Sequence, residues 1–158
     1  MPVPPTPSHI ETTDTRYLEG LVGYNARRAS LAIIGQFLPR MAAFDLRPVD
    51  FSVLSLVMHN AGITSRQLCN ALNILPPNLV GMVNTLEKRG LIARAPHPLD
   101  RRAMGLQLTR EGSRLMREAE KTAAQLELDA TAQLSAAERR TLIRLLQKIY
   151  REGTSAPL

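Results

Sequence analysis

Arginine supplies most of the side chains in this sequence whose chemistry points to a binding partner. Seventeen of the twenty basic residues are arginine, whose planar guanidinium pairs with phosphate and suits narrow minor grooves of DNA. Eight basic and three acidic residues fall between Leu86 and Arg117, so this window carries +5 of a formal net charge of +6. Its centre, Asp100-Arg101-Arg102, lies in a proline-containing loop. Such clustering favours a polyanionic partner, although charge alone fixes no function.

Two short strands are predicted on either side of this basic loop. The first is Leu91–Arg94, directly after a helix that Gly90 ends as a left-handed C′ residue. In the second, Met104, Leu106 and Leu108 alternate toward one face. Helix, strand, basic loop and strand is the order of a winged helix, so the predicted fold class is mainly α with a small two- or three-stranded β-wing.

Helical periodicity predicts six helices, and start and stop residues place their ends. Pro39 is expected to end the first helix, and Pro48 to begin the second. Capping boxes formed by Thr64 with Gln67 and by Ser135 with Glu138 begin the third and sixth. The predicted helices cover about 15–38, 48–59, 64–72, 76–89, 110–133 and 135–152.

Length and composition predict one globular domain. The chain has 158 residues, 44% of them hydrophobic but only 4% aromatic, which favours a helical core of aliphatic side chains. Residues 1–14 hold four prolines and are expected to form a flexible arm, with 15–152 as the domain and 153–158 as a flexible tail. We expect no signal peptide and no membrane span, and the single cysteine excludes an internal disulfide, so a cytoplasmic location is predicted.

The basic window and its flanks resemble the MarR family of bacterial transcription regulators. The combined spacing of three motifs carries the resemblance, since each motif alone occurs in many winged helices. The matching residues are Leu86-Glu87-Lys88-Arg89-Gly90-Leu91-Ile92, Arg94, Asp100-Arg101-Arg102, Leu108-Thr109 and Gly112. The resemblance implies a winged helix-turn-helix over about 46–109 that binds double-stranded DNA.

The same resemblance implies a homodimer held together by helices 15–38 and 110–152. Its two winged helices would read a pseudo-palindromic operator with half-sites about 34–36 Å apart. The sequence itself supports only that these helices carry more apolar surface than a lone small domain needs.

In the wing, we expect Asp100 to pair with an arginine and so orient the loop. Arg102 or Arg101 would then enter the minor groove, where narrow A·T tracts have enhanced negative potential. Arg94 at the wing base is expected to contact phosphate or to brace Asp100. The alternative is an ordinary solvated basic turn.

The helix at 76–89 departs from the family pattern on its leading turns. Pro76, Pro77, Asn78 and Gly81 stand where family members often carry Ser, Thr or Arg. Asn78 can read adenine, whereas Gly81 either admits close backbone approach or is a tolerated helical glycine. Base reading is therefore expected to be sparse. Further polar or phosphate contacts are expected from Arg66, Gln67, Asn84, Thr85 and Lys88.

The resemblance also implies a small ligand, often an aromatic or phenolic carboxylate, bound between the dimerisation region and the DNA-binding lobe. The residues expected there are Tyr24, Arg27, Arg28, Met58 and His59. An arginine could pair with a carboxylate. The alternative is an ordinary core with surface arginines.

The residues support no other chemistry. The three histidines are far apart in sequence and show no metal-binding spacing, no cofactor motif is present, and Cys69 is interpreted as a small buried hydrophobe rather than a redox sensor. No nucleophile motif indicates an enzyme. The predicted function is a repressor released by a small molecule. The alternatives are a ligand-independent architectural DNA-binding protein and a winged helix that binds another protein.

Overall fold

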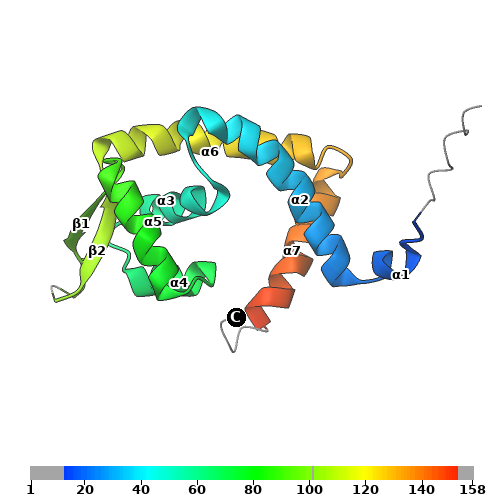
Figure 1. The fold of residues 1–158 in the computed structure, drawn as a ribbon, viewed down its shortest axis with the longest axis horizontal. Helices are drawn as coiled ribbons and strands as arrows, with labels where there is room; N and C mark the ends of the chain where they lie inside the picture. Colours follow the sequence, from blue (N-terminus) through cyan, green and yellow to red (C-terminus); the bar gives the residue numbers. More distant parts are fainter. Residues whose placement is uncertain (1–12, 101, 153–158) are drawn as a thin grey trace, which may run out of the picture.

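The computed structural model describes residues 13–100 and 102–152. Figure 1 shows two groups of elements joined by the long helix α6. The predicted fold class is confirmed, since the elements are nearly all helical with one antiparallel β-hairpin. In chain order they are α1 Arg16–Glu19, α2 Val22–Met41, the 3-10 helix η1 Ala42–Phe44, α3 Pro48–His59, α4 Ser65–Leu72, α5 Pro76–Lys88, β1 Ile92–Pro96, β2 Met104–Leu108, α6 Arg110–Ala130 and α7 Ala136–Glu152.

The group formed by α3, α4, α5, β1 and β2, called the lobe below, contains most of the core. Val53, Leu54 and Val57 of α3 are buried, as their apolar run predicts. Leu79, Val83 and Leu86 on one face of α5 are buried as well. Cys69 is also buried among these side chains.

The wing is a hairpin of β1 and β2 in which Ile92 pairs with Leu108 and Pro96 with Met104. A bridge from Ile63 to Leu106 adds the turn between α3 and α4 as a short third edge. The predicted alternation is wrong at Met104, which is 55% exposed, because the hairpin extends beyond the core that covers Leu106.

The predicted first helix begins where expected, but it is interrupted near Leu21 and ends later than expected. It divides into α1 and α2 because Leu21 is extended, and the Asn25 amide donates hydrogen bonds to the carbonyls of Glu19 and Leu21, each at 2.8 Å. Pro39 does not end α2, which continues to Met41. Gly35 is exposed, so water can satisfy the carbonyl that the proline ring leaves without an N–H donor.

The last two helices differ from each other in burial. α6 ends at Ala130 rather than near 133, and it buries Met116, Ala119 and Leu126 against the rest of the chain. None of the described side chains of α7 is buried. Within residues 13–100 and 102–152, no helix combines the length and apolar character needed to cross a membrane.

Candidate nucleic-acid interface

The outer face of α5 lies beside the wing and is open to solvent (Figure 1). Pro76 begins the helix after an extended Leu75, and burial of the inner stripe turns the other positions outward. The predicted contact residues on α5, namely Asn78, Asn84, Thr85 and Lys88, are all exposed. Gly81 is exposed too, with no atom of a neighbouring element within 4 Å of an added Cβ, so packing does not require a glycine there.

Two of these polar side chains already have partners. The Thr85 hydroxyl donates to the Gly81 carbonyl at 3.0 Å, and the Asn84 Oδ1 accepts a hydrogen bond from Arg94 at 3.4 Å. In α4, Gln67 completes the predicted capping box with Thr64, so its amide oxygen is engaged. Asn78 and Lys88 keep unengaged side chains within the described part of the chain.

The wing turn is organised by Asp100. Its Oδ1 accepts a hydrogen bond from the backbone N–H of Arg102 at 3.0 Å. Arg101 lies outside the described residues. The Arg102 side chain is exposed and makes no hydrogen bond or ion pair with any described residue. Asp100 therefore shapes the turn through the backbone.

Arg94 joins the wing to α5 rather than to Asp100. Its Nε lies 3.4 Å from the Glu87 carboxylate, and its Nη2 donates to Asn84. The expectation that Arg94 braces Asp100 is wrong, because β1 turns its side chain toward α5. This contact holds the hairpin against the helix whose outer face is exposed.

Close backbone packing anchors the wing at its base. An added Cβ at Gly105 would lie 2.1 Å from the carbonyl oxygen of Gly62. Gly62 itself has a positive φ of 86°, and its N–H donates to the Leu106 carbonyl at 2.8 Å. Glycine at both positions lets the turn after α3 approach β2, which fixes where the wing leaves the lobe.

Several arginines of the basic window form hydrogen bonds or ion pairs with other residues of the chain. Arg89 donates to the carbonyls of Asp45 at 2.7 Å and Phe44 at 3.0 Å, which ties the end of α5 to η1. Arg114 pairs with Glu111, and its hydrogen bond lowers the pKa of that carboxyl. The Arg89 contact could not be predicted from local sequence patterns, because it joins residues more than 40 positions apart.

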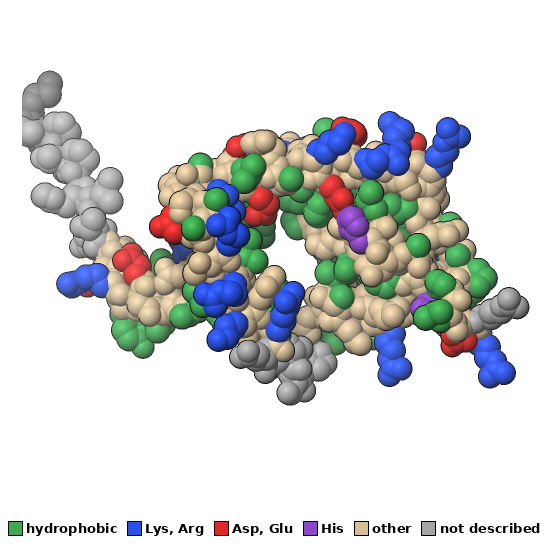
Figure 2. Space-filling view, turned by 180° about the vertical axis from the view of Figure 1, so that it is seen from behind, with side chains coloured by type: hydrophobic (Ala, Val, Ile, Leu, Met, Phe, Trp, Pro, Cys, Tyr) green, Lys and Arg blue, Asp and Glu red, His purple; other side chains and the backbone are tan. Residues whose placement is uncertain are grey.

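Within the lobe, the cations without a partner among the described residues come from three elements. They are Arg66 of α4, Lys88 of α5 and Arg102 of the wing, all exposed. In Figure 2, Lys and Arg side chains project from the edge of the lobe opposite α6 as well as along α6. This arrangement can contact phosphates on both sides of a groove that receives α5.

The five predicted ligand residues come from two helices, α2 and α3. Tyr24 is half-buried and Arg27 and Arg28 are exposed on α2, while Met58 and His59 lie at the end of α3. His59 Nε2 is 2.9 Å from Glu120 Oε1 of α6, and the Ser55 hydroxyl donates to the same oxygen at 2.8 Å.

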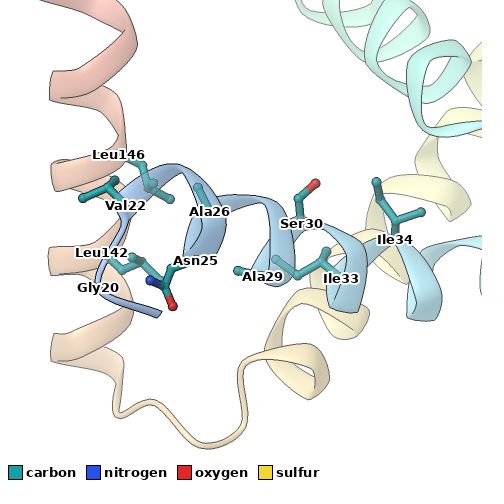
Figure 3. Close-up of a pocket in the computed structure, with 10 residues that line it drawn as sticks. All are labelled: Gly20, Val22, Asn25, Ala26, Ala29, Ser30, Ile33, Ile34, Leu142 and Leu146. Carbon is teal, nitrogen blue, oxygen red and sulfur yellow. The ribbon is translucent and has the colours of Figure 1, made fainter. Parts of the chain in front are cut away.

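A pocket of about 540 Å³ lies elsewhere, between α2 and α7 (Figure 3). Apolar side chains line most of it, with Asn25 and Ser30 as the polar ones. None of the five predicted ligand residues lines it. Leu142 and Leu146 close its α7 side, and Ala26, Ala29, Ile33 and Ile34 are on α2.

Comparison with known proteins identifies the family. Residues 44–103, which include the whole helix-turn-helix and most of the wing, match the MarR family model. A transcriptional regulatory protein for the hcr operon of Thauera aromatica is 32% identical over 141 residues, which are 89% of this chain and 85% of the relative. The chain belongs to the MarR family. It is therefore a MarR-family transcription regulator, like the relative from Thauera aromatica.

Solved MarR-family structures show the same fold. The transcriptional repressor CouR bound to a 23-mer DNA duplex matches with a TM-score of 0.80 and 36% identity, over 88% of this chain and 99% of that chain. CouR bound to p-coumaroyl-CoA matches with a TM-score of 0.78 and 34% identity, over 90% and 99%. BpsR of Bordetella bronchiseptica, whose DNA binding is regulated by 6-hydroxynicotinic acid, matches with a TM-score of 0.74 and 26% identity, over 91% and 97%.

Proposed function

We propose that this MarR-family regulator is a homodimeric, cytoplasmic DNA-binding repressor that a small aromatic ligand releases from its operator. The observation that carries the DNA-binding part is the exposed outer face of α5 between unpartnered cations on α4 and the wing. CouR, which has the same fold, is bound to a DNA duplex in one of the matching structures.

On DNA, α5 enters the major groove with its leading turn, where Asn78 can pair with adenine. Arg66 and Lys88 contact phosphates on either side, with Gln67, Asn84 and Thr85 as further polar contacts near the backbone. Arg102, or its neighbour Arg101, enters the adjacent minor groove. Arg94 acts through Glu87 and Asn84, by holding the wing at a fixed distance from α5.

The exposed apolar face of α7 supports the homodimer. Leu142, Leu145, Leu146 and Ile149 share one face of the helix and are 39–60% exposed in the single chain. A 17-residue helix that buries so little of its own chain needs another surface to stabilise it. A second copy that covers α7 and the pocket between α2 and α7 supplies that surface. The two α5 helices then read the half-sites of a pseudo-palindromic operator.

The ligand part of the proposal is supported by the compounds that two relatives bind and by the position of His59. CouR binds p-coumaroyl-CoA and BpsR responds to 6-hydroxynicotinic acid, and both compounds contain an aromatic ring with a hydroxyl group. Tyr24, Arg27, Arg28, Met58 and His59 remain the proposed contacts. His59 lies where α3 of the lobe meets α6, so a ligand there can shift the lobe relative to the dimer. A changed spacing of the two α5 helices prevents both half-sites from being occupied together.

Replacement of Arg102 by alanine tests the DNA-binding proposal. The probe is a duplex selected by the wild-type protein from a random 30-base-pair library, and binding is followed by fluorescence anisotropy over a series of salt concentrations. We expect affinity to fall about 10- to 100-fold and the salt slope to decrease by about one per wing. Arg16→Ala is the control, because Arg16 is exposed on α1 and pairs with Asp14. Unchanged affinity and slope in Arg102→Ala would contradict the proposed wing contact.

The sparse chemistry of α5 favours a second candidate, a ligand-independent architectural DNA-binding protein. Pro76, Pro77 and Gly81 occupy its leading turns and offer no base-reading group. This candidate predicts nearly equal affinity for the selected duplex and a scrambled one at physiological salt. The repressor predicts a ratio of at least about a thousandfold, so one titration separates the two.

A further inference from the structure

Leu99, at the end of the wing, is 93% exposed, more than any other large hydrophobic side chain in the described ranges. An isolated leucine on a protein surface is common and needs no explanation. Leu99 differs because three other apolar residues of the same hairpin are exposed as well. They are Pro96, Pro98 and Met104.

Hydrogen bonds hold the turn that carries Leu99. The N–H of His97 donates to the Ala103 carbonyl at 2.9 Å, and the N–H of Ala103 donates to the Asp100 carbonyl at 3.0 Å. The Leu99 N–H donates to His97 Nδ1 at 3.2 Å, and Asp100 Oδ1 accepts from the Arg102 N–H. Leu99 is therefore exposed on a turn whose described residues are hydrogen-bonded to one another.

Leu99 and Arg102 leave this turn three residues apart, which places an apolar side chain and a cation at the same tip. The minor groove of B-DNA offers both matching surfaces. It is about 6 Å wide, its walls are deoxyribose rings, and its floor has high negative potential in A·T tracts. Leucine is among the apolar side chains that other minor-groove proteins insert there.

We propose that Leu99 enters the minor groove beside Arg102 and packs against deoxyribose and base edges. This inference rests on the proposed DNA-binding function. Leu99 then contributes a part of the DNA-binding affinity that does not depend on salt concentration, because leucine releases no counterions. It also makes the wing a reader of groove width, which compensates in part for the few base-reading groups on α5.

The test compares Leu99→Asn with Leu99→Met on the duplex selected by the wild-type protein. Asparagine has similar length but a polar end, whereas methionine keeps an apolar side chain. We expect Leu99→Asn to bind about tenfold more weakly with an unchanged salt slope, and Leu99→Met to stay within about twofold of the wild type. Thermal unfolding of all three proteins should coincide, because the side chain touches little of the folded chain.

A second duplex series identifies the groove. Changing the A·T pairs under the wing to I·C alters the major groove but leaves the minor groove without the guanine amino group. Changing them to G·C adds that amino group to the floor. The difference between Leu99→Met and Leu99→Asn should persist on I·C and disappear on G·C. A difference that follows the major-groove change instead would overturn the proposal.

Equal affinities of Leu99→Asn and the wild type would also overturn it, and would leave the exposed tip to a protein partner. Failure of the proposed function looks different, since the wild-type protein would then select no duplex from the library. A tenfold loss accompanied by a smaller salt slope would contradict the apolar contact, because it would mean that the substitution had displaced Arg102.

Discussion

The lobe and α7 use the same kinds of apolar residue with opposite results. In the lobe, Val53, Leu54 and Leu68 are fully buried within one chain. In α7, Leu146 and Ile149 repeat at equally regular helical spacing and remain 39% and 60% exposed. The lobe completes its core from neighbouring segments, whereas the apolar face of α7 has no such cover in the single chain. The two functions that we propose, DNA reading by the lobe and assembly through α7, therefore belong to separate parts of this molecule.

Substitutions on the apolar face of α7 test this contrast most directly and have the largest expected effect. In the variant Leu142→Asp with Leu146→Asp, two carboxylates replace side chains that we propose are buried between two copies. Unpaired buried charges cost several kcal/mol, so the dimer dissociation constant should rise by at least about 100-fold. Affinity for the two-half-site duplex should fall with it, because the second half-site contact is lost. Sedimentation velocity and fluorescence anisotropy measure the two effects.

The matched control changes net charge by the same amount on the opposite face of α7. Arg144→Gln with Lys148→Gln removes two positive charges, as the double aspartate variant adds two negative ones. We expect this control to remain dimeric. A dimer that survives both pairs of substitutions would show that α7 is not the interface.

The same contrast explains which parts of the structure could be predicted from the sequence. Local signals placed the elements of the lobe correctly: Pro48 begins α3, Thr64 with Gln67 caps α4, and Gly90 has the positive φ expected of a C′ residue. Contacts between distant segments were not predictable in this way. Arg94 contacts α5 rather than Asp100, since the direction of β1 decides its partner.

Predictions for the outer helices were weaker for the same physical reason. The Asn25 amide breaks the predicted first helix through hydrogen bonds that a periodicity argument does not include. Pro39 is tolerated near the end of α2, where only one exposed carbonyl loses its donor. The ligand residues were chosen by their position along helices, and this position does not reveal that His59 pairs with Glu120 of α6.

The next largest effect, on the free energy of unfolding, is expected from a substitution at the junction between the lobe and α6. An added Cβ at Gly112 would lie 2.0 Å from the carbonyl oxygen of Leu91, where Thr109 also begins α6 by capping the Gly112 N–H. Gly112→Ala must push backbone apart and should destabilise the protein by about 1–3 kcal/mol. Gly81→Ala is the matched control, since open space surrounds it and alanine in a helix should stabilise by up to about 1 kcal/mol. Urea unfolding of both variants checks the opposite signs, and equal destabilisation would contradict this packing.

The smallest expected effect lies where α2 meets the end of α6. Hydrogen bonds from Gln125 and then from Arg40 lower the pKa of Asp129. A lowered pKa in the folded state means that the carboxylate adds stability above the ordinary aspartate value of about 4, and that this stability is lost as the pH falls through the folded pKa. The unfolding free energies of the wild type and Asp129→Asn should therefore differ near neutral pH and converge in acid. Asp14→Asn is the control, since Arg16 lowers the Asp14 pKa through contacts within three residues of chain and joins no helices. If both variants change stability equally, the Arg40–Asp129 pair does not couple α2 to α6.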